Sequence, residues 1–179
     1  AIIASSTAQT FAINADTFRN DGTLSVTAGT MNVSPATFTN SGTTDVSGGT
    51  LNITPTNWSN PGKINVSGGT LNLGTPFAVA DLTGTAHYSR SGGSVNLNTA
   101  LDLGGGRLDI GSAGLFGTGG LTSFSGAIKN GMLLSGDGSV LNSDSGTLDG
   151  ITIGSNLTTN GGTLYFSNGL TVADGKTFT

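Results

Sequence analysis

The 179-residue chain has no cysteine, one histidine and few charged residues. A chain without cysteine forms no disulfides, and a single histidine does not supply the ligand set of a structural zinc site. Charged residues make up 9% of the chain and the formal net charge is −4, so the basic footprint of a nucleic-acid-binding protein is missing. No run of about eighteen apolar residues is present, which excludes a helical membrane span from this segment.

Strong helix formers such as Glu and Lys are nearly absent, whereas glycine contributes 31 residues and Thr, Ser and Asn are frequent. No stretch places apolar residues at helical spacing between capping residues. The chain opens at Ala1 without the basic n-region of a signal peptide. We therefore expect an all-β structure, and we expect the chain to be a segment of a longer protein.

A repeat of twenty residues runs from Phe18 to Leu73. Three rows align with one another: FRNDGTLSVTAGTMNVSPAT, FTNSGTTDVSGGTLNITPTN and WSNPGKINVSGGTLNL. Six columns are identical in all rows, a seventh is always aromatic and an eighth is always large and apolar. The identical columns are Asn20/Asn40/Asn60, Gly22/Gly42/Gly62, Val26/Val46/Val66, Gly29/Gly49/Gly69, Thr30/Thr50/Thr70 and Asn32/Asn52/Asn72. A fixed period of this length indicates a solenoid, a propeller or an array.

Apolar and small polar residues alternate within each row, as in Leu24-Ser25-Val26. This period of two is typical of a strand with one buried face, and the runs are bounded by Gly, Asn, Ser or Pro. Twenty residues are too few for a propeller blade of about 40, but they suit a coil of two or three short strands. Parallel pairing of successive coils then predicts a right-handed parallel β-helix, which is a β-solenoid, with about eight to nine coils.

The stacked columns would have different roles in such a solenoid. The valine column should lie inside, and the aromatic column Phe18/Phe38/Trp58 should form a ladder of stacked rings. The column that begins at Gly22 follows Asn-x, which predicts a turn with a positive φ at glycine. The column that begins at Asn20 fits either a ladder of hydrogen bonds along the axis or a row of solvated turn residues.

We predict a single β-solenoid over residues 1–179. Residues 1–77 are predicted to form regular twenty-residue coils, residues 78–145 irregular coils and loops, and residues 146–179 regular coils again. The repeat is interrupted near 78–92, where we predict an irregular, exposed loop.

One outward-facing array of the predicted solenoid is regular. A threonine and an asparagine flank each large apolar residue of the eighth column. The six residues are Thr30, Asn32, Thr50, Asn52, Thr70 and Asn72. They predict a flat polar lattice with a spacing of about 4.8 Å by 6.8 Å. Such a face could bind sugars or ice, or it could simply be a solvated strand face that resists aggregation.

The predicted loop contains the second group of candidate residues. Asp81, His87, Tyr88 and Arg90 are the polar and aromatic side chains that it concentrates. Because binding residues are often found on loops, we treat these four as candidate ligand contacts.

Acid–base chemistry would need two carboxylates close together on adjacent coils. Asp102 and Asp109, with Arg107 between them, are the nearest cluster, and the aspartates from Asp137 to Asp149 form a looser one. Aspartate is also a common turn residue, and we favour that interpretation. No catalytic, cofactor-binding or metal-binding residue is predicted, and no cofactor is expected.

Several phrases resemble the repeats of large bacterial surface proteins. They are Asn40-Ser41-Gly42-Thr43, Val46-Ser47-Gly48-Gly49-Thr50-Leu51-Asn52 and Gly146-Thr147-Leu148-Asp149-Gly150-Ile151-Thr152-Ile153. The similar proteins are the filamentous-haemagglutinin-like and autotransporter-passenger adhesins. The resemblance implies a β-helical rod that is secreted or displayed at the bacterial cell surface, usually without cysteines.

The expected function is that of a non-enzymatic structural or adhesive rod segment in a large extracellular or cell-surface protein. Its expected partners are a glycan or another cell-surface molecule, and further copies associated end to end or side by side. One alternative is a carbohydrate-binding or carbohydrate-active β-helix, such as a polysaccharide lyase or hydrolase. Another alternative is an ice-binding β-solenoid.

Overall fold

The computed structural model describes residues 1–179 as short strands and turns with one 3₁₀ turn, η1 (Val79–Leu82). It confirms the predicted all-β class: parallel sheets stack as a β-solenoid of about nine turns with a spacing near twenty residues. The sequence predicted a single domain, and the contacts cluster into two compact units along it, residues 1–95 and 96–179. No helix has the length and apolar character needed to cross a membrane.

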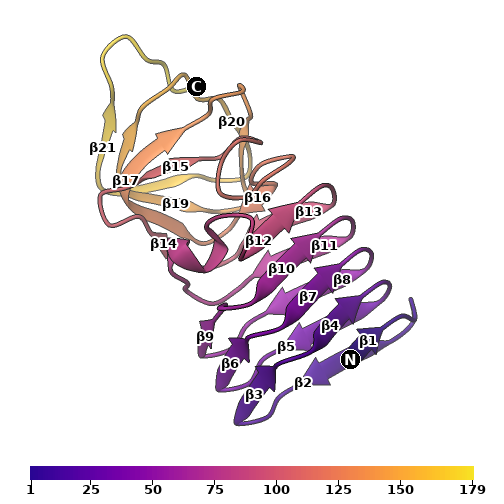
Figure 1. Ribbon diagram of the computed structural model, residues 1–179. Helices are drawn as coiled ribbons and strands as arrows, with labels where there is room; N and C mark the ends of the chain where they lie inside the picture. Colours follow the sequence, from indigo (N-terminus) through magenta and orange to yellow (C-terminus); the bar gives the residue numbers. More distant parts are fainter. The chain divides into compact units, whose positions relative to one another are not determined.

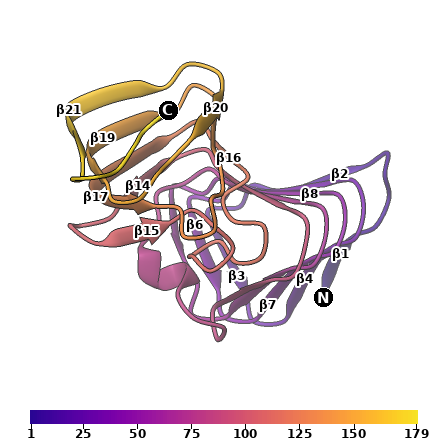
Figure 2. The same ribbon diagram turned by 90° about the horizontal axis from the view of Figure 1, so that it is seen from above.

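The first unit contains three sheets of parallel strands (Figure 1). One sheet has the order β1 (Ile2–Ala4), β4 (Thr23–Val26), β7 (Thr43–Val46), β10 (Lys63–Val66) and β12 (Tyr88–Arg90). The second begins with β2 (Thr10–Ile13), β5 (Thr30–Val33), β8 (Thr50–Ile53), β11 (Thr70–Leu73) and β13 (Ser94–Leu97). The third contains β3 (Thr17–Asn20), β6 (Thr37–Asn40) and β9 (Asn57–Ser59). Successive coils of this unit overlie one another, as Figure 2 shows from above.

Like residues pair with like residues in the first unit. Val26 pairs with Val46, which pairs with Val66, and all three side chains are buried. The large apolar column beginning at Met31 and Leu51 is stacked and buried in the same way. Inward-facing side chains of the three sheets therefore fill the core, as the alternation of apolar and polar residues predicted.

The aromatic column is also stacked. The rings of Phe18 and Phe38 are nearly parallel, with centroids 5.5 Å apart and an interplanar angle of 9°. Trp58 pairs with Phe38 in the strand register, and its ring meets Phe77 edge-on at 6.0 Å. Phe77 thus extends the aromatic column into the segment where the repeat ends.

The prediction of a positive φ in the column of Gly22, Gly42 and Gly62 is wrong. The left-handed glycines of the repeat are instead Gly29, Gly49 and Gly69, with φ of 65°, 61° and 62°. In the Gly22 column the reason for glycine is close stacking: a Cβ on Gly42 would collide with the carbonyl oxygen of Gly22, and a Cβ on Gly62 with that of Gly42. Axial contact between coils, and not the conformation of the turn, excludes a side chain there.

The asparagine column forms the axial ladder that was one of the two predicted alternatives. Nδ2 of Asn20 donates to Oδ1 of Asn40 at 2.7 Å, and Nδ2 of Asn40 donates to Oδ1 of Asn60 at 2.6 Å. All three side chains are buried. At its end, Nδ2 of Asn60 donates to the carbonyl oxygens of Asp81 and His87 at 2.8 and 3.0 Å. The inserted segment therefore completes the hydrogen bonding of the ladder.

The loop predicted near 78–92 is shorter than expected. It contains η1, but Tyr88–Arg90 form β12, in which Tyr88 pairs with Ile64 and Arg90 pairs with Val66. Backbone groups at the edge of β10 need partners, and β12 supplies them. The chain thus returns to the solenoid before the end of the predicted loop.

The second unit has coils of unequal length. One sheet has the order β14 (Ala100–Asp102), β17 (Ala127–Leu134), β19 (Thr147–Ile153) and β21 (Tyr165–Val172), and β15 (Arg107–Asp109) also pairs with β17. Strands β16 (Ser123–Phe124), β18 (Leu141–Ser143) and β20 (Thr159–Gly161) pair in that order. Ala100 pairs with Ala127, Ala127 with Thr147, and Thr147 with Tyr165, so the spacing changes at every step. The coils predicted as regular over residues 146–179 include a shift of register between Asp149 and Ile151.

Candidate functional site

The predicted polar lattice exists on the outer face of β5, β8 and β11. Its threonine and asparagine columns are in register, and every lattice side chain is partly exposed while its neighbours along the strand are buried. The lattice residues are Thr30, Asn32, Thr50, Asn52, Thr70 and Asn72. The structure therefore brings together all six residues, and their role in binding stays a prediction.

The asparagines of the lattice are bonded to one another. Nδ2 of Asn52 donates to Oδ1 of Asn32 at 2.7 Å, and Nδ2 of Asn72 donates to Oδ1 of Asn52 at 2.6 Å. Beside them, the hydroxyls of Ser34 and Thr54 are 2.6 Å apart. A primary amide has two N–H donors and two acceptor lone pairs, so the ladder uses only part of the capacity of Asn52. The fixed amides could hydrogen-bond hydroxyl groups of a ligand.

No charged side chain lies on β2, β5, β8 or β11. The neighbouring sheet differs, because its outward positions include Asp45 and Lys63. There Nδ2 of Asn65 donates to Oδ1 of Asp45 at 2.7 Å, and the hydroxyl of Ser89 donates to Oδ1 of Asn65 at 2.6 Å. The lattice is thus a neutral face beside a face that carries charge.

Two of the four predicted loop contacts lie in the loop. The carboxylate of Asp81 accepts from the backbone N–H of Ala78 at 2.9 Å and from that of Asn60 at 3.3 Å. Nδ1 of His87 lies 3.2 Å from the carbonyl oxygen of Gly62. Both side chains therefore contact the backbone of the loop and of the coil before it. These contacts hold the loop in place. That Asp81 and His87 contact a ligand stays a prediction.

The other two predicted loop contacts, Tyr88 and Arg90, are not in an exposed loop. Tyr88 is only 5% exposed, and burial raises the pKa of its phenol. Arg90 occupies the position that follows Val66 in the inward valine column, and burial lowers the pKa of its guanidinium. Its N–H groups donate to the carbonyl oxygens of Gly92 and Gly93. Both residues were misplaced by the sequence analysis because β12 begins inside the stretch that lacks the repeat.

The aspartates considered for acid–base chemistry are bonded to turns. Oδ2 of Asp137 accepts from the backbone N–H of Ser112 at 2.8 Å, and Oδ1 accepts from the N–H and hydroxyl of Ser139 at 3.0 and 2.6 Å. The bonds from Ser139 and Ser112 hold the pKa of Asp137 well below its usual range. Oδ1 of Asp109 accepts from the backbone N–H of Gly111 and Gly136. A carboxylate with a lowered pKa is a poor general acid near neutral pH, so the turn interpretation fits these contacts better.

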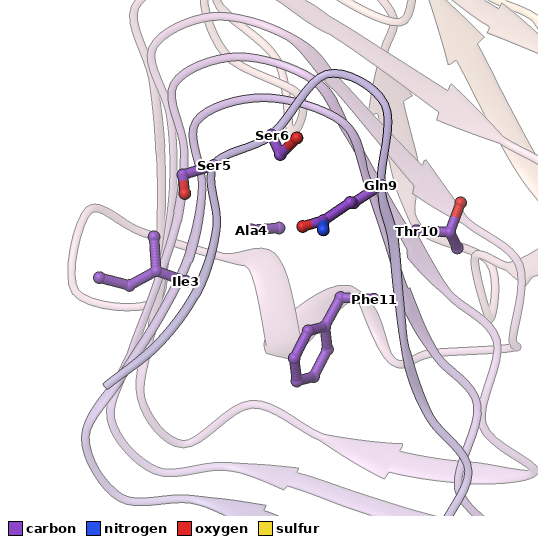
Figure 3. A pocket seen from close by; sticks show the side chains of 7 residues that line it. All are labelled: Ile3, Ala4, Ser5, Ser6, Gln9, Thr10 and Phe11. Atoms are coloured by element: carbon purple, nitrogen blue, oxygen red, sulfur yellow. The ribbon is translucent and has the colours of Figure 1, made fainter.

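The structure contains no cluster of three or more His, Cys, Asp or Glu side chains that could hold a metal ion. A cavity with a volume of about 220 Å³ lies at the first coil, between β1 and β2 (Figure 3). The cavity is lined by Ile3, Ala4, Ser5, Ser6, Gln9, Thr10 and Phe11. None of these side chains is titratable, so the cavity contains no general acid or base, and no base that could activate its serine or threonine hydroxyls.

A further outward surface, in the second unit, was missed by the sequence analysis. It lies on β14, β17, β19 and β21 and includes the exposed Tyr165. These strands lie outside the regular twenty-residue rows, so their outward residues do not align as columns in the sequence. Consecutive residues of a strand point to opposite faces, but Tyr165 and Phe166 are both aromatic, so the sequence contains no signal for which of them faces outward.

Comparison with protein-family models, with curated proteins and with solved structures finds no match to this chain.

Proposed function

We propose that this chain is a structural and adhesive segment of a large bacterial surface or secreted protein, of the filamentous-haemagglutinin-like or autotransporter-passenger class. Its work is to hold polar surfaces in a fixed repeat, without catalysis. The observation that carries the proposal is the stacking of like residues in successive coils, with polar ladders bonded both inside and outside. The resemblance of the repeats to those adhesins supplies the extracellular setting.

A stiff scaffold follows from the bonding of the first unit. Every coil there is joined to its neighbour by parallel strands, and the Asn20–Asn40–Asn60 ladder adds side-chain hydrogen bonds within the core. Buried, fully bonded polar networks rigidify a structure because breaking one bond leaves an unpaired group away from water. Repeated surfaces on such a scaffold make many weak contacts, which add through multivalency.

Contacts of the carboxylates support a non-enzymatic role. Asp102, Asp109 and Asp137 all accept backbone N–H bonds in turns. The backbone N–H of Gly104 and the amide of Asn130 also lower the pKa of Asp102. A polysaccharide hydrolase needs one carboxylic acid whose pKa is raised so that it can protonate the leaving group. The pKa values of Asp102 and Asp137 are lowered instead, which is the opposite of what a general acid requires.

Glycan binding is the second candidate function, and the neutral lattice favours it. Amides and hydroxyls fixed at regular spacing can hydrogen-bond sugar hydroxyls, and the face carries no charge that would select an acidic polymer. In an adhesive segment this function would be part of the same role.

The proposal is tested by asking where the protein is and what it attaches to. Cells that produce the protein should lose it on brief treatment with external protease, and purified chain should coat host-cell or glycan surfaces. Sedimentation of the purified chain should show association that grows with concentration. A protein that stays protease-resistant inside intact cells and binds no cell or glycan surface would contradict the proposed role.

A further inference from the structure

The outward face of the β14-β17-β19-β21 sheet combines an exposed aromatic ring with a row of mixed charges. We name this surface the tyrosine strip and define it by Asp102, Ala127, Lys129, Thr147, Asp149 and Tyr165. Ala127 pairs with Thr147, which pairs with Tyr165. Asp102 pairs with Lys129, which pairs with Asp149. The strip therefore has two parallel rows, separated along each strand by one inward residue.

The ring of Tyr165 points outward and is accessible. Its neighbour Phe166 pairs with Leu148, which is fully buried, so Tyr165 lies on the opposite face of β21. Tyr165 is 54% exposed and Phe166 is 50% exposed, because β21 is the last strand of its sheet, so the register and not the exposure identifies the outward face. The residues below Tyr165 in the same row are the short side chains of Thr147 and Ala127. An aromatic ring beside short side chains leaves an open, flat surface along the strip.

The charged row has unused hydrogen-bonding capacity. Lys129 lies between Asp102 and Asp149 in the strand register, yet it forms an ion pair with neither. The two carboxylates are instead held from the corner of the coil: Nδ2 of Asn130 donates to Asp102 at 3.0 Å and Nδ2 of Asn168 to Asp149 at 2.5 Å. Asn130 and Asn168 have φ of 54° and 50°, a conformation in which asparagine is the most tolerated residue after glycine.

We propose that the tyrosine strip binds a neutral oligosaccharide of hexose units, with one pyranose ring on Tyr165 and its hydroxyls on Asp149 and Lys129. The apolar C–H face of a pyranose packs on an aromatic ring. Its hydroxyls donate to a carboxylate and accept from an ammonium group, so alternating charges serve both halves of each hydroxyl. This inference names a partner for the proposed adhesive role and rests on it.

Charge and size on the strip favour this partner over others. The strip carries two acidic groups and one basic group, and the chain has a net charge of −4, which repels acidic polysaccharides. Measured perpendicular to the strands, the four strands span only about 14 Å. A stable protein interface needs about 800 Å² on each partner, which is much more than this strip offers. A few sugar units fit that size.

Binding can be measured by isothermal titration and by amide shifts in NMR spectra of the full chain. The probes are neutral hexasaccharides of glucose (both α- and β-linked), mannose and N-acetylglucosamine, with hexagalacturonate as the acidic probe. At least one neutral probe should bind and shift the amides of residues 147–167. Tyr165→Ala should weaken binding about tenfold, whereas Tyr165→Phe should retain most of it because the ring stays.

Two further variants separate the strip from the rest of the surface. Lys129→Met keeps the side-chain length but removes the donors, and it should weaken binding about tenfold. Asp16→Asn removes an exposed carboxylate of the first unit, outside the strip and the lattice, and should leave the affinity for the strip ligand unchanged. The proposal is overturned if no neutral probe binds, if only hexagalacturonate binds, or if Tyr165→Ala and Lys129→Met both bind as the wild type does.

The same variants distinguish failure of the strip from failure of the proposed function. If the wild type coats cells and Tyr165→Ala coats them equally, the strip is wrong and the adhesive role stands. If a neutral hexasaccharide binds through Tyr165 but the protein is never found outside the cell, the strip stands and the surface role is wrong.

Discussion

Asn40 is fully buried, yet its amide forms four hydrogen bonds. It accepts from Asn20 and Thr44, and it donates to Asn60 and to the carbonyl oxygen of Lys63. Such a residue is specified by its partners, because each of them would be left unpaired in its absence. The repeat identified the asparagine column from the sequence, but the choice between a buried ladder and solvated turns needed the structure.

Asn40→Ala should lower the free energy of unfolding by about 3–5 kcal/mol, because several buried partners lose their bonds. Asn52→Ala is the matched control, since it removes the corresponding member of a ladder on the partly exposed lattice. Water can replace those bonds, so its cost should stay near or below about 1 kcal/mol. Urea unfolding of the two variants gives the comparison. Equal losses would contradict the assignment of the inner ladder as the more important one.

Trp58 contains the one buried side-chain donor without a partner, its Nε1. Trp58→Phe keeps an aromatic ring between Phe38 and Phe77 and removes that donor. Because an unsatisfied buried N–H costs about 1–3 kcal/mol, the loss of apolar area should be offset and stability should stay within about 1 kcal/mol of wild type. Thermal unfolding measures this. Phe38→Ala in the same column should cost about 3–5 kcal/mol, and an equal effect of both changes would contradict the explanation.

Asp137 should make stability depend on acidic pH. Its folded pKa is lowered by bonds from Ser139 and Ser112, so its contribution is present above the unfolded pKa of 3.8 and is lost as pH falls towards the folded value. Asp137→Asn should therefore lower Tm at about pH 6, and the difference from wild type should shrink towards about pH 2. Asp16→Asn, at an exposed carboxylate with no hydrogen bond, serves as control. A difference that is constant over the whole range would rule out the linkage.

At the scale of elements, the stacking of coils is controlled by glycine columns. Gly42→Ala places a methyl group against the backbone of Gly22, in contact with the coil below. Gly22→Ala is the matched control, because nothing lies within 4 Å of a Cβ there. We expect Gly42→Ala to cost about 2–3 kcal/mol and Gly22→Ala to change stability by less than about 1 kcal/mol. Urea unfolding with an unchanged m-value would show this, and equal effects would contradict the stacking argument.

The elements of the first unit were predictable because their pairing repeats. Val26 and Val46 align in the rows and pair in the sheet, so one local rule fixes strand, face and partner. The same rule fails after Leu73, where Tyr88 pairs with Ile64 although the spacing differs from twenty. A strand of three residues in an irregular stretch has too little periodicity to be recognised from sequence.

At the scale of the whole molecule, a solenoid should tolerate loss of one complete coil. Deletion of residues 18–37 removes one period, so Thr17 is followed by Phe38 and the remaining columns stay in register. The shortened chain should fold and unfold cooperatively with a smaller m-value, because less surface is exposed on unfolding. Deletion of residues 18–27 breaks the register and should prevent folding. Non-cooperative unfolding of the full-coil deletion would contradict the solenoid as a stack of equivalent units.

Like the elements of the fold, the candidate surfaces could be predicted from the sequence only where the twenty-residue repeat is regular. The lattice was predictable, because Thr30 and Asn32 recur in every row on the outward side of the strand. The tyrosine strip was not, because Lys129 and Asp149 become neighbours only through coils that no longer share one period. The inward position of Arg90 was equally hidden, since it depends on which strand β12 joins.

The sequence by itself determined the repeat length, the alternation of faces and the columns that stack, because all three follow from residues within one twenty-residue period. Tertiary structure alone decided where the inner ladder ends, which strand follows the inserted segment and which polar groups meet on the second unit. The physical reason is that parallel pairing joins residues a whole coil apart. Once the coil length varies, only the folded backbone specifies which residues become neighbours.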